Sequence, residues 1–446
     1  MRIVFGQRAM GFPWLPVVLF FFFALFPIEL GQCLLHGPDP AELAAEGGEG
    51  PKKMVAGVAL LFTFARLRRL SPFLRNLFYA IIGYTCLLCL ESYFVYGTPF
   101  VYPHVFSKFF VVFWATAVYI AFRGAKEWAF TVAMLLMIAI FIIDITVYYP
   151  HVLSIGSFMD VDRGLHASMV FFLLAGFIYS FNTYLTTTKV FWLVVLFACL
   201  GLILFLNHRT VWLATITSMA LNILLIQLKG KEPIVPTAWT PLIVVPTVAV
   251  FFVFAYVFTE KPELLASIVD RITDIEKVNE QGTGKWRIEQ FQSYLPFVID
   301  HPLIGMRFEG FELPVQFIAE QTGEEVFVAN TGHHFHSFYM DSLFYHGLAG
   351  LVLLSMPFIN PIYRLWHFPI KPSARLIGLC CWCLIALQYG LSYPLYEFHF
   401  AMAGFTLAYM DTCLDKADAE QANLQAQYAE AELPEPEQEF SGQATA

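Results

Sequence analysis

Long apolar runs recur from one end of this 446-residue sequence to the other, and they restrict its fold more than any other feature. A helix of about 17–25 apolar residues crosses the hydrocarbon core of a bilayer. Only helices and closed barrels satisfy all their backbone groups there. Hydrophobic residues make up 58% of the chain and charged residues 14%, which is atypical of a soluble domain. The sequence therefore predicts an all-α polytopic membrane protein.

The apolar runs divide the chain into about twelve candidate transmembrane helices. They cover approximately residues 14–33, 54–65, 74–97, 104–122, 128–149, 166–185, 190–206, 211–228, 240–258, 337–360, 376–392 and 395–412. Residues 1–258 hold the first nine candidates, residues 337–413 hold the last three, and residues 259–336 form a large polar loop between them. Residues 414–446 are acidic, and we expect a disordered or weakly helical tail there.

Lysine and arginine are distributed unevenly between the two sides that these spans define. With the N-terminus in the cytoplasm, most of them lie in cytoplasmic segments, among them Arg66, Arg123 and Arg375. The short outer segments carry few, among them Lys108 and Arg209. Because cytoplasmic loops are enriched in these residues, we expect both termini in the cytoplasm and the large loop outside. No basic patch of the kind that binds nucleic acid is apparent in the sequence.

Three histidines, His333, His334 and His336, end the large loop directly before a predicted helix. A histidine where a water-exposed loop enters the membrane is placed for acid–base chemistry on a polar substrate beside lipid. On a helical wheel, Gly347 and Gly350 share a face with His336, and such glycines let another helix approach closely. In isolation His336 also fits a simple interfacial residue. Its assignment therefore depends on the rest of the chain.

Two arginines on the same side of the membrane suit a phosphate ligand. Arg209 lies in a tight turn between two spans, where a charge is costly without an anionic partner. Arg287 lies on an amphipathic helix predicted from the spacing of Ile288, Phe291 and Leu295, which we expect to rest on the outer membrane surface. Arginine binds phosphate oxygens bidentately. Two arginines could hold a membrane-bound diphosphate while a histidine accepts the proton of an attacking hydroxyl.

Three local patterns follow one another on this side of the membrane. They are Arg209-Thr210 at the start of a span, Arg287 followed by His301-Pro302-Leu303-Ile304-Gly305, and His336-Ser337 followed by Leu343, Gly347 and Gly350. Together they resemble the Ser-Arg turn, the Arg…His-Pro-Leu-x-Gly segment and the His-Asn…Leu…Gly-x-x-Gly element of the bacterial O-antigen ligase and polymerase family of polytopic glycosyltransferases. His208 stands at the usual serine, Ser337 at the usual asparagine, and Met306 where a glycine often follows.

The resemblance implies transfer of a glycan from undecaprenyl diphosphate to an acceptor. Within the family we expect an O-antigen ligase, which transfers a polysaccharide to lipid A–core. The reaction is expected at the periplasmic face of the bacterial inner membrane, without a nucleotide sugar, a cofactor or a metal. By position in the family's patterns, Arg209 and Arg287 are expected to bind the diphosphate. His336 is expected to activate the acceptor hydroxyl.

Further polar residues are secondary candidates. His301 belongs to the second pattern and His334 adjoins the catalytic candidate. Glu397 and His399 begin the last span on the outer side, where each fits either a packing partner or a substrate contact.

Asp160 and Asp162 form a D-x-D pair in a short outer loop. Such a pair can bind a divalent metal together with a diphosphate, so it offers a metal-dependent alternative. The pair also fits solvated residues that cap the next helix, and we favour this interpretation.

Other functions remain open at this point. A polymerase of the same family uses a second lipid-linked glycan as acceptor, and a protein O-oligosaccharyltransferase uses a protein hydroxyl. A twelve-helix transporter belongs to another class. It requires paired helix breaks or polar residues at mid-membrane on a pseudo-symmetric plan. Here the polar content lies mainly in one asymmetric outer loop, which favours the glycosyltransferase.

Overall fold

The computed structural model describes residues 12–25, 49–154, 165–232, 234–260, 283–313, 333 and 335–431. Its principal helices are α1 (Leu15–Phe20), α4 (Glu49–Ala65), α5 (Pro72–Tyr96), α6 (Pro103–Phe122), α7 (Glu127–Ile143), α9 (Ala167–Thr187), α10 (Val190–Phe205), α11 (Arg209–Lys229), α12 (Trp239–Glu260), α14 (Thr283–Asp300), α15 (Arg307–Glu312), α16 (Phe338–Trp366), α17 (Ala374–Tyr389) and α18 (Glu397–Ala431). Short helical turns are η1 (Phe21–Leu25), η2 (Leu67–Arg69), η3 (Asp144–Tyr148), η4 (Pro150–Leu153) and η5 (Pro236–Ala238). The described residues include no strand, so the all-α prediction is confirmed.

Every predicted span overlaps one of these helices. Six helical segments in the described part of the chain are long and apolar enough to cross a membrane, namely α5, α6, Glu127–Tyr148, α9, α11 and α16. Shorter apolar helices are Leu15–Leu25, Lys53–Ala65, Val190–Phe205 and Ala374–Tyr389. The structure therefore supports a membrane protein with six candidate spans. The larger number of about twelve, derived from the sequence, stays a prediction.

The core of the bundle consists of α6, α9, α17 and the first half of α18, which are the most completely buried helices. Close approach of α6 and α18 depends on Gly404, because a Cβ there would lie 2.0 Å from the carbonyl oxygen of Ala115. Inside the bundle, Asn182 of α9 and Asn222 of α11 exchange hydrogen bonds of 3.0 and 2.6 Å. Small residues and buried amides are the usual means of holding helices together in lipid.

The two ends of the bundle differ in their charged side chains. At one end, called the basic end, Arg123 pairs with Asp411 at 2.5 Å, Arg364 pairs with the same carboxylate, and Arg375 pairs with Glu127 at 2.5 Å. The opposite end holds the first turns of α6, α9, α11, α16 and α18, and is called the site end. The predicted cytoplasmic arginines thus gather at one end of the bundle, although its orientation in the membrane stays a prediction.

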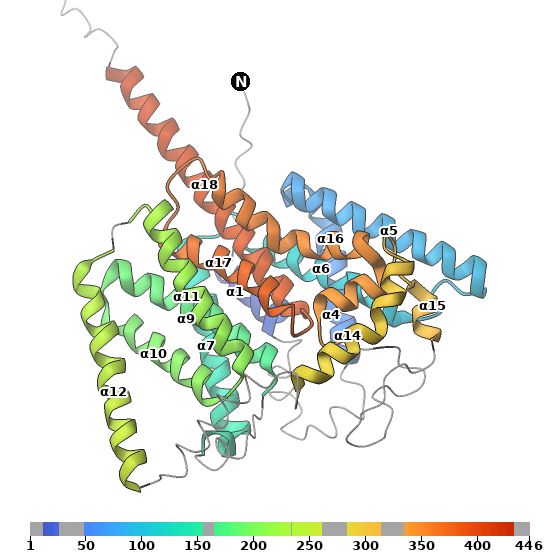
Figure 1. The fold of residues 1–446 in the computed structure, drawn as a ribbon. Coiled ribbons are helices and arrows are strands. Elements are labelled where there is room, and N and C mark those ends of the chain that lie inside the picture. Colours follow the sequence, from blue (N-terminus) through green and yellow to red (C-terminus); the bar gives the residue numbers. More distant parts are fainter. Residues whose placement is uncertain are drawn as a thin grey trace, which may run out of the picture.

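The first part of the tail is helical, which is one of the two states expected from the sequence. Helix α18 continues from the core through Ala431 and extends beyond the rest of the bundle (Figure 1). Its first residues after the core remain attached to the basic end, because Lys416 lies 3.3 Å from Glu127. The segment 415–431 is therefore helical, which the abundance of alanine, glutamine and glutamate in it favours.

Candidate functional site

Helix α16 is interrupted at Gly347, whose φ of 60° and ψ of −159° are not helical. The segment 302–306 lies against this interruption. The amides of Leu348 and Ala349 donate to the carbonyls of Pro302 (2.8 Å) and Leu303 (3.0 Å), and the Met306 amide donates to the Phe344 carbonyl (2.7 Å). A chain segment that precedes α15 therefore supplies acceptors for helix amides that the break leaves unpaired.

Two motif glycines make this contact possible. Gly305 and Gly347 both have positive φ values, of +67° and +60°. A Cβ on either residue would lie 2.5 Å from backbone atoms of the opposite segment, which is closer than atoms can approach. The second and third sequence patterns thus form one structural unit, in which the glycines allow backbone to meet backbone.

His336 lies outside α16, which corrects the helical-wheel prediction. The helix begins at Phe338, and the Ser337 hydroxyl caps it by accepting from the Met340 amide at 3.4 Å. His336 therefore does not share a continuous helical face with Gly347, because the helix starts after the histidine and is interrupted at the glycine. The histidine is exposed at the site end. Such a position leaves its ring accessible to a substrate.

A cavity of about 530 Å³ adjoins His336. Its walls come from α4, α6, the start of α16 and the start of α18, and they consist of Lys53, Ala56, His104, Ser107, Lys108, Phe110, Val111, Trp114, Phe335, His336, Phe338, Asp341, Ser342, Leu354, Pro394, Leu395, Tyr396, Glu397 and Phe400. Glu397, a secondary candidate from the sequence, thus lies in the same cavity wall as His336. Neither Arg209 nor Arg287 is part of it.

An ion pair in this wall was not found by the sequence reasoning. Lys108 of α6 donates to both carboxylate oxygens of Asp341 in α16, at 2.7 and 2.5 Å. The same ammonium lies 4.6 Å from the centroid of the Tyr345 ring. Each residue is detectable in the sequence as a charge within an apolar run, but their pairing joins two helices far apart in the chain.

Helix α14 is attached to α16 by a buried hydrogen-bond network. The Tyr294 hydroxyl lies 2.6 Å from His333 Nδ1, and the Tyr345 hydroxyl accepts from the His333 amide (2.7 Å) and donates to its carbonyl (2.9 Å). His333 is therefore a structural link between the two helices. Arg287 lies two helical turns before Tyr294, on the same face of α14.

The packed face of α14 is the one that carries Arg287. Gln290 and Tyr294 are buried, whereas Ile288 and Phe291 of the predicted apolar face are 41% and 47% exposed. The Arg287 guanidinium carbon lies 4.8 Å from the centroid of the Tyr393 ring. The amphipathic helix thus turns its arginine toward the bundle and leaves Ile288 and Phe291 exposed.

A series of contacts connects the three predicted residues across the site end. Next to Arg209, the first residue of α11, His208 Nε2 lies 2.8 Å from the Leu165 carbonyl oxygen at the start of α9. On α9, the Ser168 hydroxyl lies 3.1 Å from the Tyr389 hydroxyl, and the Tyr389 ring stacks on Tyr393 at 5.0 Å.

Tyr393 connects this series to the remaining two candidates. Its ring contacts Arg287, and its carbonyl accepts from the amide of Phe338 at 3.3 Å, two residues after His336. All three candidates therefore lie at the site end of the bundle. Fewer contacts separate Arg287 from His336 than separate either of them from Arg209.

The remaining candidates differ in their positions. His399 is fully buried, with its ring stacked on Phe398 at 4.2 Å, and it does not line the cavity. His301 follows α14 and directly precedes the segment 302–306, and its carbonyl accepts from the amide of Gly305 at 3.0 Å. His334, Asp160 and Asp162 lie outside the described residues. Within the described ranges, no group of three or more His, Cys, Asp or Glu side chains is arranged to hold a metal ion.

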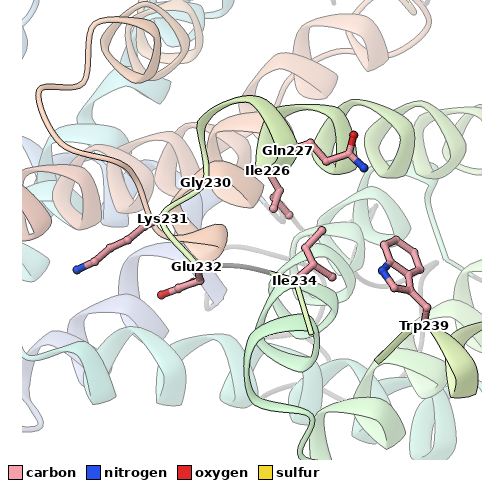
Figure 2. Close-up of a pocket in the computed structure, with 7 residues that line it drawn as sticks. All are labelled: Ile226, Gln227, Gly230, Lys231, Glu232, Ile234 and Trp239. Atoms are coloured by element: carbon pink, nitrogen blue, oxygen red, sulfur yellow. The ribbon is translucent and has the colours of Figure 1, made fainter. Parts of the chain in front are cut away.

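A second cavity, of about 500 Å³, lies near the basic end between α11 and α12. Figure 2 shows Lys231 pointing away from the apolar side chains of Ile226, Ile234 and Trp239. Glu232 accepts a hydrogen bond of 3.3 Å from the amide of Ala374 at the start of α17. The charged groups here do not converge on a ligand, so this cavity is not a candidate site.

Comparison with known families adds independent information. Residues 174–355 match the family model described as O-antigen ligase. This range contains Arg209, Arg287, His336, Gly305 and Gly347, and therefore all three sequence patterns. No curated protein matches the chain. The family resemblance inferred from the sequence is confirmed.

Proposed function

The chain carries an O-antigen ligase family domain in residues 174–355, and from this premise we propose that it transfers a polysaccharide from undecaprenyl diphosphate to lipid A–core. The reaction takes place at the periplasmic face of the bacterial inner membrane, where the site end of the bundle lies. The observation that carries the proposal is the packing of Arg287 on the ring of Tyr393. The carbonyl of Tyr393 also accepts from the amide of Phe338, two residues after His336. The cationic Arg287 and the proposed base His336 therefore both lie near Tyr393.

The proposed reaction needs a proton acceptor and a stabilised leaving group. His336 takes the proton from the acceptor hydroxyl as its oxygen forms a bond to the anomeric carbon of the donor. The bond between that carbon and the diphosphate oxygen breaks at the same centre, and undecaprenyl diphosphate leaves with the electron pair. Arg287 and Arg209 bind the phosphate oxygens and stabilise the charge that develops on them.

Purified protein in lipid nanodiscs provides the test, with polyprenyl-diphosphate-linked glycan as donor and rough lipopolysaccharide as acceptor. We expect His336→Ala to lower transfer about 10²–10⁴-fold, the usual contribution of a general base. Arg209→Ala and Arg287→Ala each remove charged hydrogen bonds and are expected to lower transfer about tenfold or more. The matched controls are His367→Ala and Arg68→Ala, which lie at the basic end. Near-wild-type transfer by His336→Ala excludes its role as base.

A deletion strain identifies the acceptor. Loss of a ligase leaves long lipid-linked glycan and bare core, whereas loss of a polymerase leaves core capped with a single repeat. Loss of a protein O-oligosaccharyltransferase leaves the lipopolysaccharide intact. We expect the first pattern. Uptake of a solute by proteoliposomes that contain no acceptor is the corresponding test of a transporter, and we expect none.

A further inference from the structure

The cavity beside His336 has the chemistry of a site for an uncharged polar ligand. Two carboxylates, Asp341 and Glu397, and two ammonium groups, Lys53 and Lys108, line it, so their formal charges cancel. Lys108 is already neutralised by Asp341, to which it donates twice. A diphosphate placed here would face both carboxylates, whereas ligand hydroxyls can donate to carboxylates and accept from ammonium groups.

Part of this polar wall remains available to a ligand. The Lys108 and Asp341 side chains are 11% and 18% exposed, so their ion pair is reachable from the cavity. Glu397 is half-buried, and within the described part of the chain it makes no ion pair or side-chain hydrogen bond. Its carboxylate is therefore available to accept hydrogen bonds from the hydroxyls of a ligand in the cavity.

Trp114 gives an independent indication of a ligand. The residue is 2% exposed and lines the cavity, yet its indole N–H has no hydrogen-bond acceptor among the described residues. Buried donors in folded proteins are nearly always paired, so this indole N–H is suited to donate to a polar atom of a ligand in the cavity. Trp114 lies six residues after Lys108 on α6, so the cavity reaches about 9 Å along the helix axis.

The apolar part of the wall suits a sugar ring. Phe110, Phe335 and Tyr396 contribute aromatic rings to it. A sugar has apolar C–H faces and a rim of hydroxyls, and aromatic residues combined with a few polar groups match both. At about 530 Å³ the cavity is also within the range typical of small-molecule sites.

We propose that this cavity is the acceptor subsite, in which Glu397 and the Lys108–Asp341 pair bind the hydroxyls of one acceptor sugar beside His336. The assignment of this ligand as the acceptor rests on the proposed transferase function. The recognition of an uncharged sugar by the cavity does not depend on that function. The donor diphosphate occupies the other side of the segment that joins α17 to α18. There, Tyr393 contacts Arg287, while the next residue, Pro394, lines the cavity.

The test measures binding and catalysis separately for each substrate. The probes are deacylated core oligosaccharide, whose binding to nanodisc-embedded protein is measured directly, and polyprenyl-diphosphate-linked glycan as donor. Glu397→Gln is the principal variant, because it removes a charge without leaving a partner unpaired. The double variant Lys108→Met/Asp341→Asn removes both members of the ion pair together. Asp300→Asn is the matched control, since Asp300 is exposed near the site end and does not line the cavity.

We expect Glu397→Gln to weaken oligosaccharide binding about tenfold or more, as for the loss of a hydrogen bond to a charged group. Its KM for the acceptor rises in parallel, while its KM for the donor stays within about twofold of wild type. The double variant behaves likewise, and Asp300→Asn binds like wild type.

Two results separate this proposal from the proposed function. If wild type transfers glycan but oligosaccharide binding is the same in Glu397→Gln, the double variant and Asp300→Asn, the acceptor subsite is refuted and the transferase stands. If wild type transfers nothing but its oligosaccharide binding depends on Glu397, the sugar site stands and the reaction is refuted. A rise confined to the donor KM also overturns the assignment of the cavity to the acceptor.

Discussion

The contact between Gly347 and the segment 302–306 leads to a quantitative prediction for Gly347→Ala. The φ of 60° and ψ of −159° at Gly347 lie in a region that only glycine adopts readily, and an alanine there costs about 1–3 kcal/mol. The new Cβ also lies 2.5 Å from the Ile304 amide nitrogen and the Leu303 carbonyl carbon. The two segments must therefore separate.

Separation of the segments weakens three backbone hydrogen bonds, two from α16 to the segment and one in the other direction. Each contributes about 0.5–1.5 kcal/mol net. Together with the backbone strain, we expect a loss of about 3–7 kcal/mol in the free energy of unfolding. Glycan transfer is lost as well, because the segment 302–306 directly follows α14, which carries Arg287.

Gly97→Ala is the matched control. Gly97 also has a positive φ, of +72°, but a Cβ there meets no atom within 4 Å. Its cost is therefore the conformational term alone, about 1–2 kcal/mol. Gly201→Ala, in open space within α10, controls for the substitution itself and is expected to be neutral or slightly stabilising.

The measurement is the thermal unfolding midpoint of each purified variant in the same detergent, followed by circular dichroism and by tryptophan fluorescence. We expect Gly347→Ala to unfold several degrees below Gly97→Ala. The double variant Gly305→Ala/Gly347→Ala is expected to be only slightly worse than either single variant, because both substitutions break the same contact. Equal midpoints for Gly347→Ala and Gly97→Ala contradict the proposed close approach of the two backbones.

Two further predictions concern the side-chain networks at opposite ends of the bundle. Tyr294→Phe removes the hydroxyl that lies 2.6 Å from His333 Nδ1. We expect a loss of about 0.5–1.5 kcal/mol in stability, the net contribution of one hydrogen bond, together with weaker glycan transfer, measured by thermal unfolding and by the nanodisc assay. Asp411→Asn leaves Arg123 and Arg364 without their shared carboxylate. We expect a loss of about 3 kcal/mol in the free energy of unfolding. The KM values for donor and acceptor should change little, because the site end is not involved. An Asp411→Asn protein as stable as wild type shows that the ion pairs are not what holds these helices together.

Local sequence features determined where the helices and the candidate residues lie along the chain. Apolar runs must become helices in lipid because no water is present there to pair with an open backbone. The spacing of Ile288, Phe291 and Leu295 likewise predicted α14. The three patterns placed Arg209, Arg287 and His336 near ends of predicted helices, and the structure has them at one end of the bundle.

Only the tertiary structure decided how these elements meet. It showed that Gly305 and Gly347 face each other across a helix break, that α14 packs through the face of Arg287, and that Lys108 pairs with Asp341 beside His336. Periodicity along one helix reports which residues share a face, but not which face turns inward or which residue of another helix lies opposite. Those relations depend on the rotation and crossing of whole helices, which are set by packing among segments distant in sequence.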